Sequence, residues 1–227
     1  MTEDSRALPN GNAKRRIHAV VALRLLEVIR DQDIPPELLE DENPTVTMPR
    51  RFGLSEVVER QIRKYREDLR RRVRLTDEEV QDLFRLVIRR PDAEEIFYKL
   101  GRMLAGADSP GRWRRLVPKA LAYPLARNRV RRKLKSLFGR RIGGFGRGAF
   151  TIEGRSLFFI EADPGGDACF FLSGFCQAVL EHATTRPGEM VHSLCQSRGD
   201  ELCRWEGSLL ESPKSVPAPT SPEAEVP

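Results

Sequence analysis

Apolar residues recur three or four positions apart in four segments of the first half of the chain, as on the buried face of a helix. The segments span residues 13–31, 54–74, 76–88 and 92–106, and each carries charged residues between its apolar positions. We therefore predict a helical N-terminal region over residues 13–106, with the apolar faces of its helices packed together as a bundle.

The third of these segments has a defined beginning. Thr76 can accept a hydrogen bond from the backbone N–H of Glu79, and the Glu79 carboxylate can reach back to the backbone N–H of Thr76. This capping box precedes the apolar positions of the segment, and Pro91 is expected to end its helix. The fourth helix starts at Asp92 and is expected to end near Gly106.

The period of the pattern changes in the second half of the chain. Residues 125–139 still show helical spacing, and Gly139 is a natural end for that helix. Beyond it, residues 148–154 and 156–163 have the composition of short strands. The tight Glu153-Gly154-Arg155 turn between them predicts a hairpin.

A second pair of predicted strands follows an apolar helix that begins near Ala168. These strands cover residues 190–195 and 201–207, with a turn at residues 196–200 between them. The order after the long helix is therefore ββαββ. The chain as a whole is expected to have an α+β fold, in which this domain has a small antiparallel sheet.

Both ends of the chain lack a helical or strand period. Residues 1–12 are polar, and residues 208–227 contain five prolines, so we predict that both segments are disordered. Between them, the composition shift after Gly111 separates the helical region, residues 13–106, from a second domain at residues 112–207.

The composition, 40% apolar and 32% charged, is typical of a folded globular protein with a charged helical part. No run of residues approaches the roughly 18 apolar positions that would span a bilayer. The N-terminus has no apolar core like that of a secretory signal, so we expect a cytoplasmic protein. In that reducing compartment, clustered cysteines favour metal binding, redox chemistry or core packing over disulfides.

Positive charge is concentrated in residues 112–147. This segment has thirteen positive charges and no acidic residue, although the whole chain has a net charge of only +6. Such a segment can bind the phosphates of nucleic acid or an anionic membrane face, or it can pair with acidic groups of the N-terminal helices. The candidate basic patch comprises Arg127, Arg129, Arg131, Arg132, Lys133 and Lys135.

Four cysteines lie within 35 residues, and none occurs before residue 169. A hairpin would bring Cys195 and Cys203 together, while the start of the apolar helix places Cys169 nearby. His192 can complete a tetrahedron of three thiolates and one imidazole, a donor set that suits a closed, structural Zn²⁺ site. Cys176 is expected to be a core residue. Packing of all four cysteines as small apolar side chains remains the alternative, because CxxC pairs are absent.

These residues carry a family resemblance. Their run resembles the C-terminal signature of 4-vinyl-reductase domains, whose fold is shared by subunits of the TRAPP vesicle-tethering complex and by haem-nitric-oxide sensor domains. The family also includes the sensory domains of phenol-responsive bacterial transcription activators. In its zinc-bearing sensors three cysteines and a carboxylate hold the metal, and the carboxylate position falls on His192 here. The matching residues are Cys169, Gly174, Phe175, Ala178, Cys195, Gly199, Asp200, Cys203 and Trp205.

The resemblance covers about residues 112–207 and implies a homodimeric module with an apolar pocket between helices and sheet. The ligand would be a small aromatic or lipid-like molecule, and residues 157–160 and 170–172 could line the pocket. Because no output domain accompanies the module, it would signal through a protein partner. Alternatively, the apolar residues fill the core and the protein is a scaffold or adaptor, like the vesicle-tethering subunits.

The chain offers little for catalysis. Its three histidines form no recognisable triad, and four protein ligands on zinc leave no position for a reactive water. The glycine-rich residues 143–148 precede a predicted strand instead of linking a strand to a helix, which argues against dinucleotide binding. We therefore expect a non-enzymatic binding protein, with nucleic-acid or anionic-surface binding through residues 112–147 as a further alternative.

Overall fold

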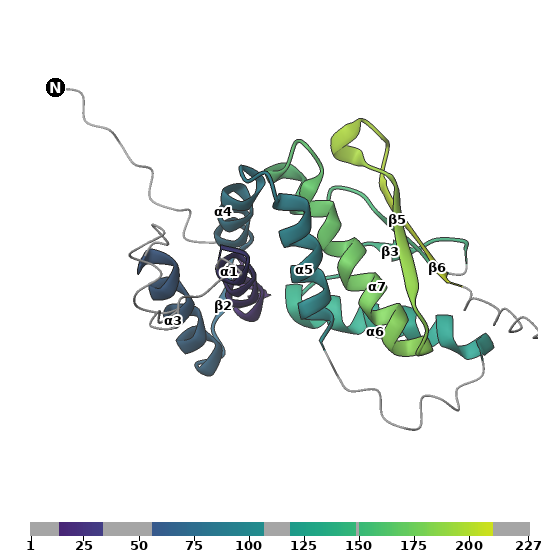
Figure 1. Cartoon of the computed structure of the whole chain (residues 1–227), viewed down its shortest axis with the longest axis horizontal. Helices are drawn as coiled ribbons and strands as arrows, with labels where there is room; N and C mark the ends of the chain where they lie inside the picture. The colour runs from purple at the N-terminus through teal and green to yellow at the C-terminus, as the bar shows by residue number, and fades with distance from the viewer. Residues whose placement is uncertain (1–13, 34–55, 107–118, 149, 211–227) are drawn as a thin grey trace, which may run out of the picture.

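The computed structural model describes residues 14–33, 56–106, 119–148 and 150–210. These residues form an α+β structure in which helices precede and cover an antiparallel four-stranded sheet (Figure 1). None of the described helices combines the length and the apolar character needed to cross a bilayer. The helices are α1 (Val20–Asp33), α3 (Glu56–Arg70), α4 (Asp77–Ile88), α5 (Ala93–Ala105), α6 (Lys119–Phe138) and α7 (Phe170–Thr184).

Two sheets accompany the helices. Two short strands, β1 (Ile17–His18) and β2 (Arg74–Leu75), pair with each other among the N-terminal helices. The larger sheet has the order β3-β4-β6-β5, and all its neighbouring strands are antiparallel. Its strands are β3 (Gly144–Phe145), β4 (Thr151–Gly154), β5 (Gly188–Leu194) and β6 (Cys203–Leu209).

The helix α7 packs on the larger sheet, and aromatic residues fill the interior beside it. Phe138 of α6 lies 5.2 Å from Phe158 and 5.7 Å from Phe171 of α7, between ring centroids. Phe159 and Phe175 extend the cluster, and all five rings are buried. Most of the apolar side chains of residues 157–160 and 170–172 thus pack in this core.

Helices α5 and α7 approach each other with backbone against backbone. A Cβ atom on Gly174 would lie 2.1 Å from the carbonyl oxygen of Tyr98, and one on Gly101 would lie 2.1 Å from that of Phe171. Beside this contact, the Tyr98 hydroxyl of α5 donates a hydrogen bond to the side-chain oxygen of Gln177 on α7 over 2.8 Å. The helical residues 13–106 and the domain at residues 112–207 therefore share one continuous hydrophobic core.

Most of the predicted helices are confirmed. The capping box at Thr76 and Glu79 is present at the start of α4, although that helix ends at Ile88, before Pro91. α5 ends at Ala105 with Gly106 as its C-cap. α6 ends at Phe138, and Gly139 adopts a positive φ of 64°. The C-terminal part also has two strands before α7 and two after it, but the first pair is β3 and β4 and not the predicted pair at residues 148–154 and 156–163.

Several elements differ from the predictions. The expected strand at residues 156–163 is instead an irregular segment ending in the 3₁₀-helix η2 (Ile160–Ala162), because successive apolar side chains are buried together there. β4 therefore pairs with β3 and β6, and the predicted hairpin was wrong. The first helix starts only at Val20, since Ile17–His18 forms β1.

At the C-terminal end, β6 continues to Leu209, two residues into the segment expected to be disordered. It does so because Leu209 still pairs with Gly188 of β5. The remaining predictions of disorder, for residues 1–12 and 211–227, concern segments outside the described residues.

The stability of the fold is expected to depend on pH through His18. Its Nδ1 accepts a hydrogen bond from the backbone N–H of Val20 over 3.2 Å at the start of α1. Burial, with a smaller contribution from the nearby Arg74 charge, lowers the pKa of His18 below its ordinary value of 6.5. Protons therefore bind the unfolded chain more readily than the folded one, and stability falls as the pH drops below about 6.5.

We expect urea unfolding to show a lower free energy at pH 5.5 than at pH 7.5, with part of the loss removed in His18→Asn. Asparagine retains an oxygen acceptor for the Val20 N–H but does not titrate. If the pH dependence of His18→Asn equals that of the wild type, the His18 contribution is refuted.

A candidate metal centre

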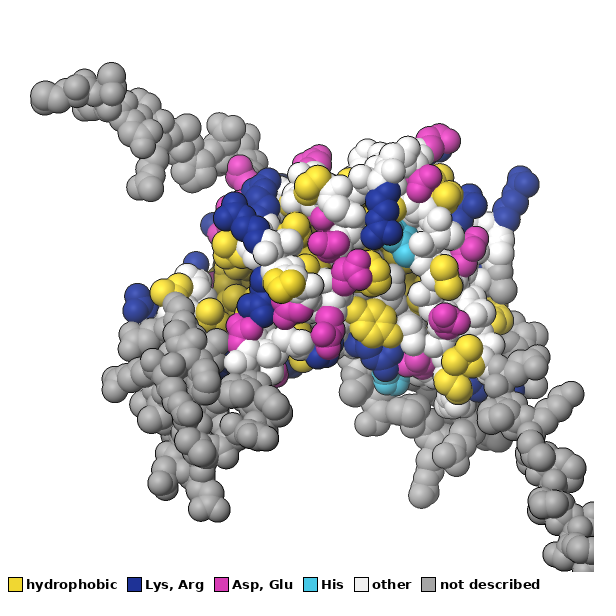
Figure 2. Space-filling model, turned by 45° about the horizontal axis from the view of Figure 1, so that its top comes forward, with side chains coloured by type: hydrophobic (Ala, Val, Ile, Leu, Met, Phe, Trp, Pro, Cys, Tyr) yellow, Lys and Arg dark blue, Asp and Glu magenta, His cyan; other side chains and the backbone are white. Residues whose placement is uncertain are grey.

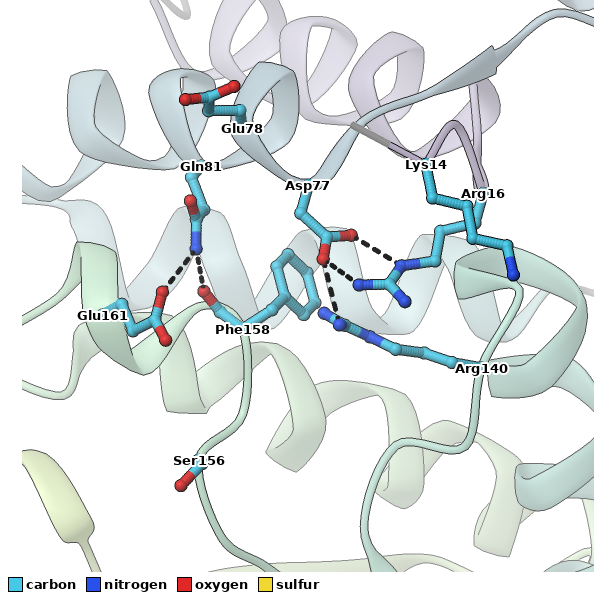
Figure 3. A pocket seen from close by; sticks show the side chains of 9 residues that line it. All are labelled: Lys14, Arg16, Asp77, Glu78, Gln81, Arg140, Ser156, Phe158 and Glu161. Atoms are coloured by element: carbon cyan, nitrogen blue, oxygen red, sulfur yellow. Dashed lines mark hydrogen bonds and ion pairs between the residues drawn. The ribbon is translucent and has the colours of Figure 1, made fainter. Parts of the chain in front are cut away.

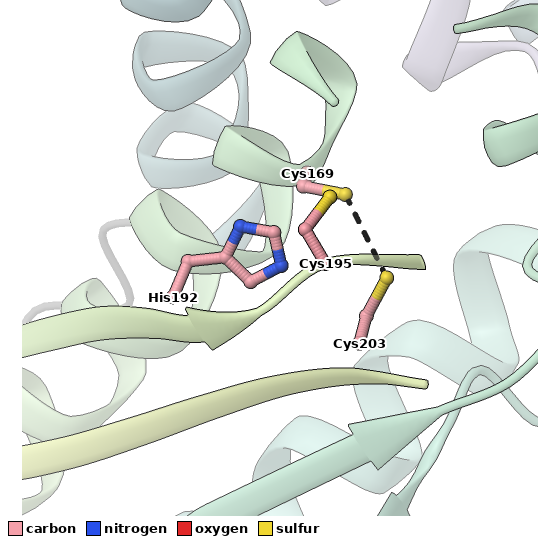
Figure 4. A group of neighbouring side chains, drawn as sticks. All are labelled: Cys169, His192, Cys195 and Cys203. Carbon is pink, nitrogen blue, oxygen red and sulfur yellow. Dashed lines mark hydrogen bonds between the residues drawn. The ribbon is translucent and has the colours of Figure 1, made fainter. Parts of the chain in front are cut away.

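The four candidate ligands come together at one end of the sheet. Cys169 ends the 3₁₀-helix η3 (Asp167–Cys169) ahead of α7, His192 lies on β5, Cys195 follows β5, and Cys203 begins β6. Their potential ligand atoms all lie within 4.8 Å of one another, and the side chains converge on one point (Figure 4). The predicted cluster of Cys169, His192, Cys195 and Cys203 is thus formed, and it could hold a metal ion such as zinc.

A strand irregularity allows His192 and Cys195 to share the site. In a regular strand, residues three positions apart point to opposite faces of the sheet. Here the register with β6 shifts between His192 and Leu194, and β5 ends at Leu194. Cys195 therefore lies beyond the strand, one residue after the end of β5, and its side chain can turn toward the imidazole.

The spacing of the donor atoms suits zinc. The Sγ atoms of Cys169 and Cys203 are 4.0 Å apart. An ideal tetrahedron with Zn–S bonds of about 2.3 Å has sulfur atoms about 3.8 Å apart. The Nε2 atom of His192 is buried and has no hydrogen-bond partner, which is costly for a polar atom unless something binds it. In Figure 4 the imidazole points toward the cysteine side chains.

The imidazole is held in place by a neighbouring aromatic ring. The rings of His192 and Trp205 stack with centroids 4.8 Å apart and an interplanar angle of 10°. Trp205 is fully buried and pairs directly with His192 across β5 and β6. This stacking fixes the orientation that directs the imidazole at the thiols.

Hydrogen bonds within the cluster favour a thiolate on Cys203. The hydrogen bond with the Cys169 thiol, then the charge of the nearby His192 imidazole and the backbone N–H of Gln196, lower the pKa of Cys203 below its ordinary range. Correspondingly, the hydrogen bond to Cys203 and burial raise the pKa of Cys169. The Gln196 N–H lies 3.2 Å from the Cys203 Sγ. A divalent cation would replace the proton that the two sulfur atoms share.

The segment before Cys169 is organised by one buried carboxylate. Asp163 is 1% exposed and accepts hydrogen bonds from the backbone N–H groups of Gly165, Gly166 and Ala168 over 2.6–3.1 Å. Gly166 has a φ of 90°, and a Cβ atom on it would lie 2.8 Å from the Cys195 Sγ. The sequence analysis missed this loop, although the Asp-Pro-Gly-Gly run starting at Asp163 is a recognisable turn signal.

The turn between β5 and β6 is held in a similar way. The Asp200 carboxylate accepts a hydrogen bond from the backbone N–H of Cys195 over 2.6 Å, and Gly199 adopts a φ of 102°. The Ser197 hydroxyl donates to the carbonyl oxygen of Asp163 over 2.8 Å. The two loops that carry Cys169 and Cys195 are therefore tied to each other independently of any metal.

Asp163→Ala is expected to destabilise the fold by about 1–3 kcal/mol, because three backbone N–H groups lose their acceptor. Zinc affinity is expected to fall about 10- to 100-fold, as for other residues that orient metal ligands. Urea unfolding and competition with a zinc-binding dye measure the two effects. Asp167→Ala is the matched control, and equal losses in both variants would contradict the role of Asp163.

Cys176 lies in α7 and is not part of the cluster. It is fully buried among apolar side chains, and this burial raises the pKa of its thiol. The expectation that Cys176 is a core residue agrees with this placement.

The basic patch is only partly exposed. Arg131, Arg132 and Lys135 are exposed on α6, whereas Arg127, Arg129 and Lys133 are half-buried. Arg127 donates to the carbonyl oxygen of Gly148 and lies over the Phe145 ring, and Lys133 donates to the carbonyl oxygen of Ala105 at the end of α5.

Elsewhere in the basic segment, Arg140 forms an ion pair with Asp77 of α4 over 3.0 Å. Part of the positive charge of the segment is therefore balanced by an N-terminal helix, which was one of the two expected alternatives. On the face shown in Figure 2, acidic and basic side chains are interspersed. Residues 112–118 of the segment lie outside the described residues.

The chain matches no protein-family model, no curated protein and no solved structure.

Proposed function

We propose that Cys169, His192, Cys195 and Cys203 hold a structural zinc ion in a non-catalytic binding module. The observation that carries this proposal is the convergence of three buried cysteine sulfur atoms on one imidazole nitrogen that has no hydrogen-bond partner. When bound, the zinc would supply four bonds that join the start of α7 to β5 and β6. Because all four positions are filled by protein atoms, no open position remains for a reactive water.

We further propose that the module binds a small aromatic or lipid-like molecule and signals through a protein partner, with a homodimer as its working form. The support is the resemblance to 4-vinyl-reductase domains. Three residues of that resemblance each have a physical role in the structure. Gly174 permits the close contact between α5 and α7, Trp205 orients His192, and Asp200 holds the turn after Cys195. Native mass spectrometry of the purified full chain tests this proposal through a co-purified small molecule.

The zinc proposal is tested by metal analysis of the full-length protein purified without added metal. The wild type is expected to contain about one zinc per chain, and Cys203→Ser is expected to lose it. His192→Ala is expected to bind zinc more weakly, because it removes one of the four candidate ligands. Cys176→Ala is the matched cysteine control and is expected to keep its metal.

The outcomes separate the parts of this proposal. A wild-type protein that neither contains zinc nor takes it up from solution would overturn the metal centre. If His192→Ala binds zinc as tightly as the wild type, His192 is the wrong fourth ligand. A stable protein partner without any co-purified small molecule would replace the sensor with the scaffold or adaptor function.

A second candidate function rests on α6. The exposed side chains of Arg131, Arg132 and Lys135 form no ion pair with a carboxylate in the described part of the chain, so they are available to phosphates. Filter binding of duplex DNA at two salt concentrations tests it. Binding that weakens steeply with salt and is lost on changing all three residues to glutamine would support nucleic-acid binding, and salt-independent or absent binding would remove it.

A further inference from the structure

A polar hollow lies away from the metal centre, where the N-terminal helices meet the C-terminal part. Its volume is about 370 Å³, within the range of roughly 300–1,000 Å³ that is common for small-molecule sites. Its walls come from the segment before β1, the first turns of α4, the residue after Gly139, and the segment from Ser156 to η2 (Figure 3). The lining is mostly charged, in contrast to the apolar pocket expected from the resemblance.

Positive charge is in excess at one end of this hollow. Arg16 and Arg140 both pair with the carboxylate of Asp77, through the Arg16 Nε at 3.1 Å and the Arg140 Nη1 at 3.0 Å. Two guanidinium groups thus share one negative charge. Lys14 is exposed at the same end and forms no ion pair within the described residues, which adds a second uncompensated charge.

Arg140 itself is incompletely satisfied. Its Nη2 atom is buried and has no hydrogen-bond partner. The guanidinium lies over the ring of Phe158, with 4.9 Å from Cζ to the ring centroid, so its position is fixed by packing as well as by Asp77. A planar guanidinium with unused N–H groups is the usual partner of a carboxylate or phosphate group.

The opposite end of the hollow is acidic. Glu161 accepts a hydrogen bond from Gln81 over 3.4 Å, and Gln81 also donates to the Phe158 carbonyl oxygen over 2.5 Å. Glu78, which is exposed, also lines the hollow, and in Figure 3 both Glu161 and Glu78 lie on the side away from Lys14, Arg16 and Arg140. An anionic group entering the hollow is therefore directed to the basic end and kept from the acidic end.

We propose that this hollow binds a small soluble molecule through an oxyanion group, a carboxylate or a phosphate, held between Lys14 and Arg140. The proposal deepens the sensing function by naming a ligand class and a second site, and in that respect it rests on the proposed function. Its chemistry is independent of zinc, since no residue of the hollow is a candidate metal ligand.

The hollow is connected to the metal centre by two hydrogen bonds. The backbone N–H of Ser156, in its wall, donates to the Gln196 side-chain oxygen over 2.9 Å. The backbone N–H of Gln196 in turn donates to the Cys203 Sγ over 3.2 Å. The wall of the hollow is therefore joined through Gln196 to the turn between β5 and β6.

The test uses the full-length protein and two probes, inorganic phosphate and acetate, at constant ionic strength set with sodium chloride. Isothermal titration calorimetry is expected to detect saturable binding of at least one probe to the wild type. Lys14→Gln and Arg140→Gln are expected to weaken it by at least about tenfold, because each removes a charged hydrogen-bond donor. Arg63→Gln, which changes an exposed arginine of α3 outside the hollow and outside α6, is the matched control and is expected to bind like the wild type.

Lys14→Gln keeps the test decisive if Arg140→Gln fails to fold, because Lys14 is exposed and unpaired in the described part of the chain. No binding of either probe to the wild type would overturn the site, as would an equal loss of affinity in Arg63→Gln. The probe that binds more tightly identifies the oxyanion. Zinc content, measured on the same samples, reports separately on the metal proposal, so that failure of one leaves the other standing.

Discussion

Cys203→Ser is expected to lower the thermal unfolding temperature of the protein and to make it insensitive to chelators. Zinc that binds only the folded state stabilises it by about 4 kcal/mol when free zinc exceeds the dissociation constant a thousandfold. Removing one thiolate is expected to forfeit most of this contribution, because Cys203 is one of the three cysteines of the candidate centre and its Sγ lies 4.0 Å from that of Cys169.

The measurement is thermal unfolding with and without a chelator. The wild type and Cys176→Ala are expected to lose stability on chelation, whereas Cys203→Ser is expected to show the same transition in both conditions. Cys176→Ala controls for the general cost of changing a buried cysteine, since Cys176 is fully buried outside the cluster. A chelator-induced shift in Cys203→Ser as large as that of the wild type would contradict the assignment of Cys203.

Gly174→Ala is expected to destabilise the fold by more than about 3 kcal/mol, at the upper end of overpacking costs. The added Cβ atom would lie 2.1 Å from the Tyr98 carbonyl oxygen, and the obstacle is backbone, so no side-chain rotation can relieve the clash. Helices α5 and α7 would have to separate. Urea unfolding measures the change.

Gly144→Ala is the matched control, because a Cβ atom there would meet only the Arg141 Nη2 at 3.7 Å, an ordinary contact. Its free energy of unfolding is expected to change by less than about 0.5 kcal/mol. If Gly174→Ala is as stable as Gly144→Ala, the close contact between α5 and α7 is not maintained in solution.

The helices were predictable from local signals. The Thr76 and Glu79 capping box and the glycines at positions 106 and 139 act within a few residues, so their effects can be identified without knowledge of the fold. The irregular segment at residues 156–163 could not be predicted in this way. Its apolar side chains are buried from several directions by α4, α6 and α7, and such a segment has the same composition as a buried strand.

The candidate site was likewise predictable only in part. Spacing and chemistry were enough to group Cys169, Cys195 and Cys203 with His192. The register shift in β5 and the stacking of Trp205 on His192 depend on contacts between strands, which the sequence alone does not specify. The hollow around Arg140 was missed for the same reason, since its walls come from segments more than 100 residues apart in the chain.

The contact between α5 and α7 has a consequence for how the protein can be divided. A fragment that began at residue 112 would leave the Gly174 face of α7 and the adjoining apolar surface in water, with nothing to replace the helix that covers them. The helical half of the chain therefore covers a face of the cysteine-bearing half that belongs to their shared hydrophobic core. A chimaera that takes the cysteine-bearing half from one protein and places it in another would therefore have to include α5 as well.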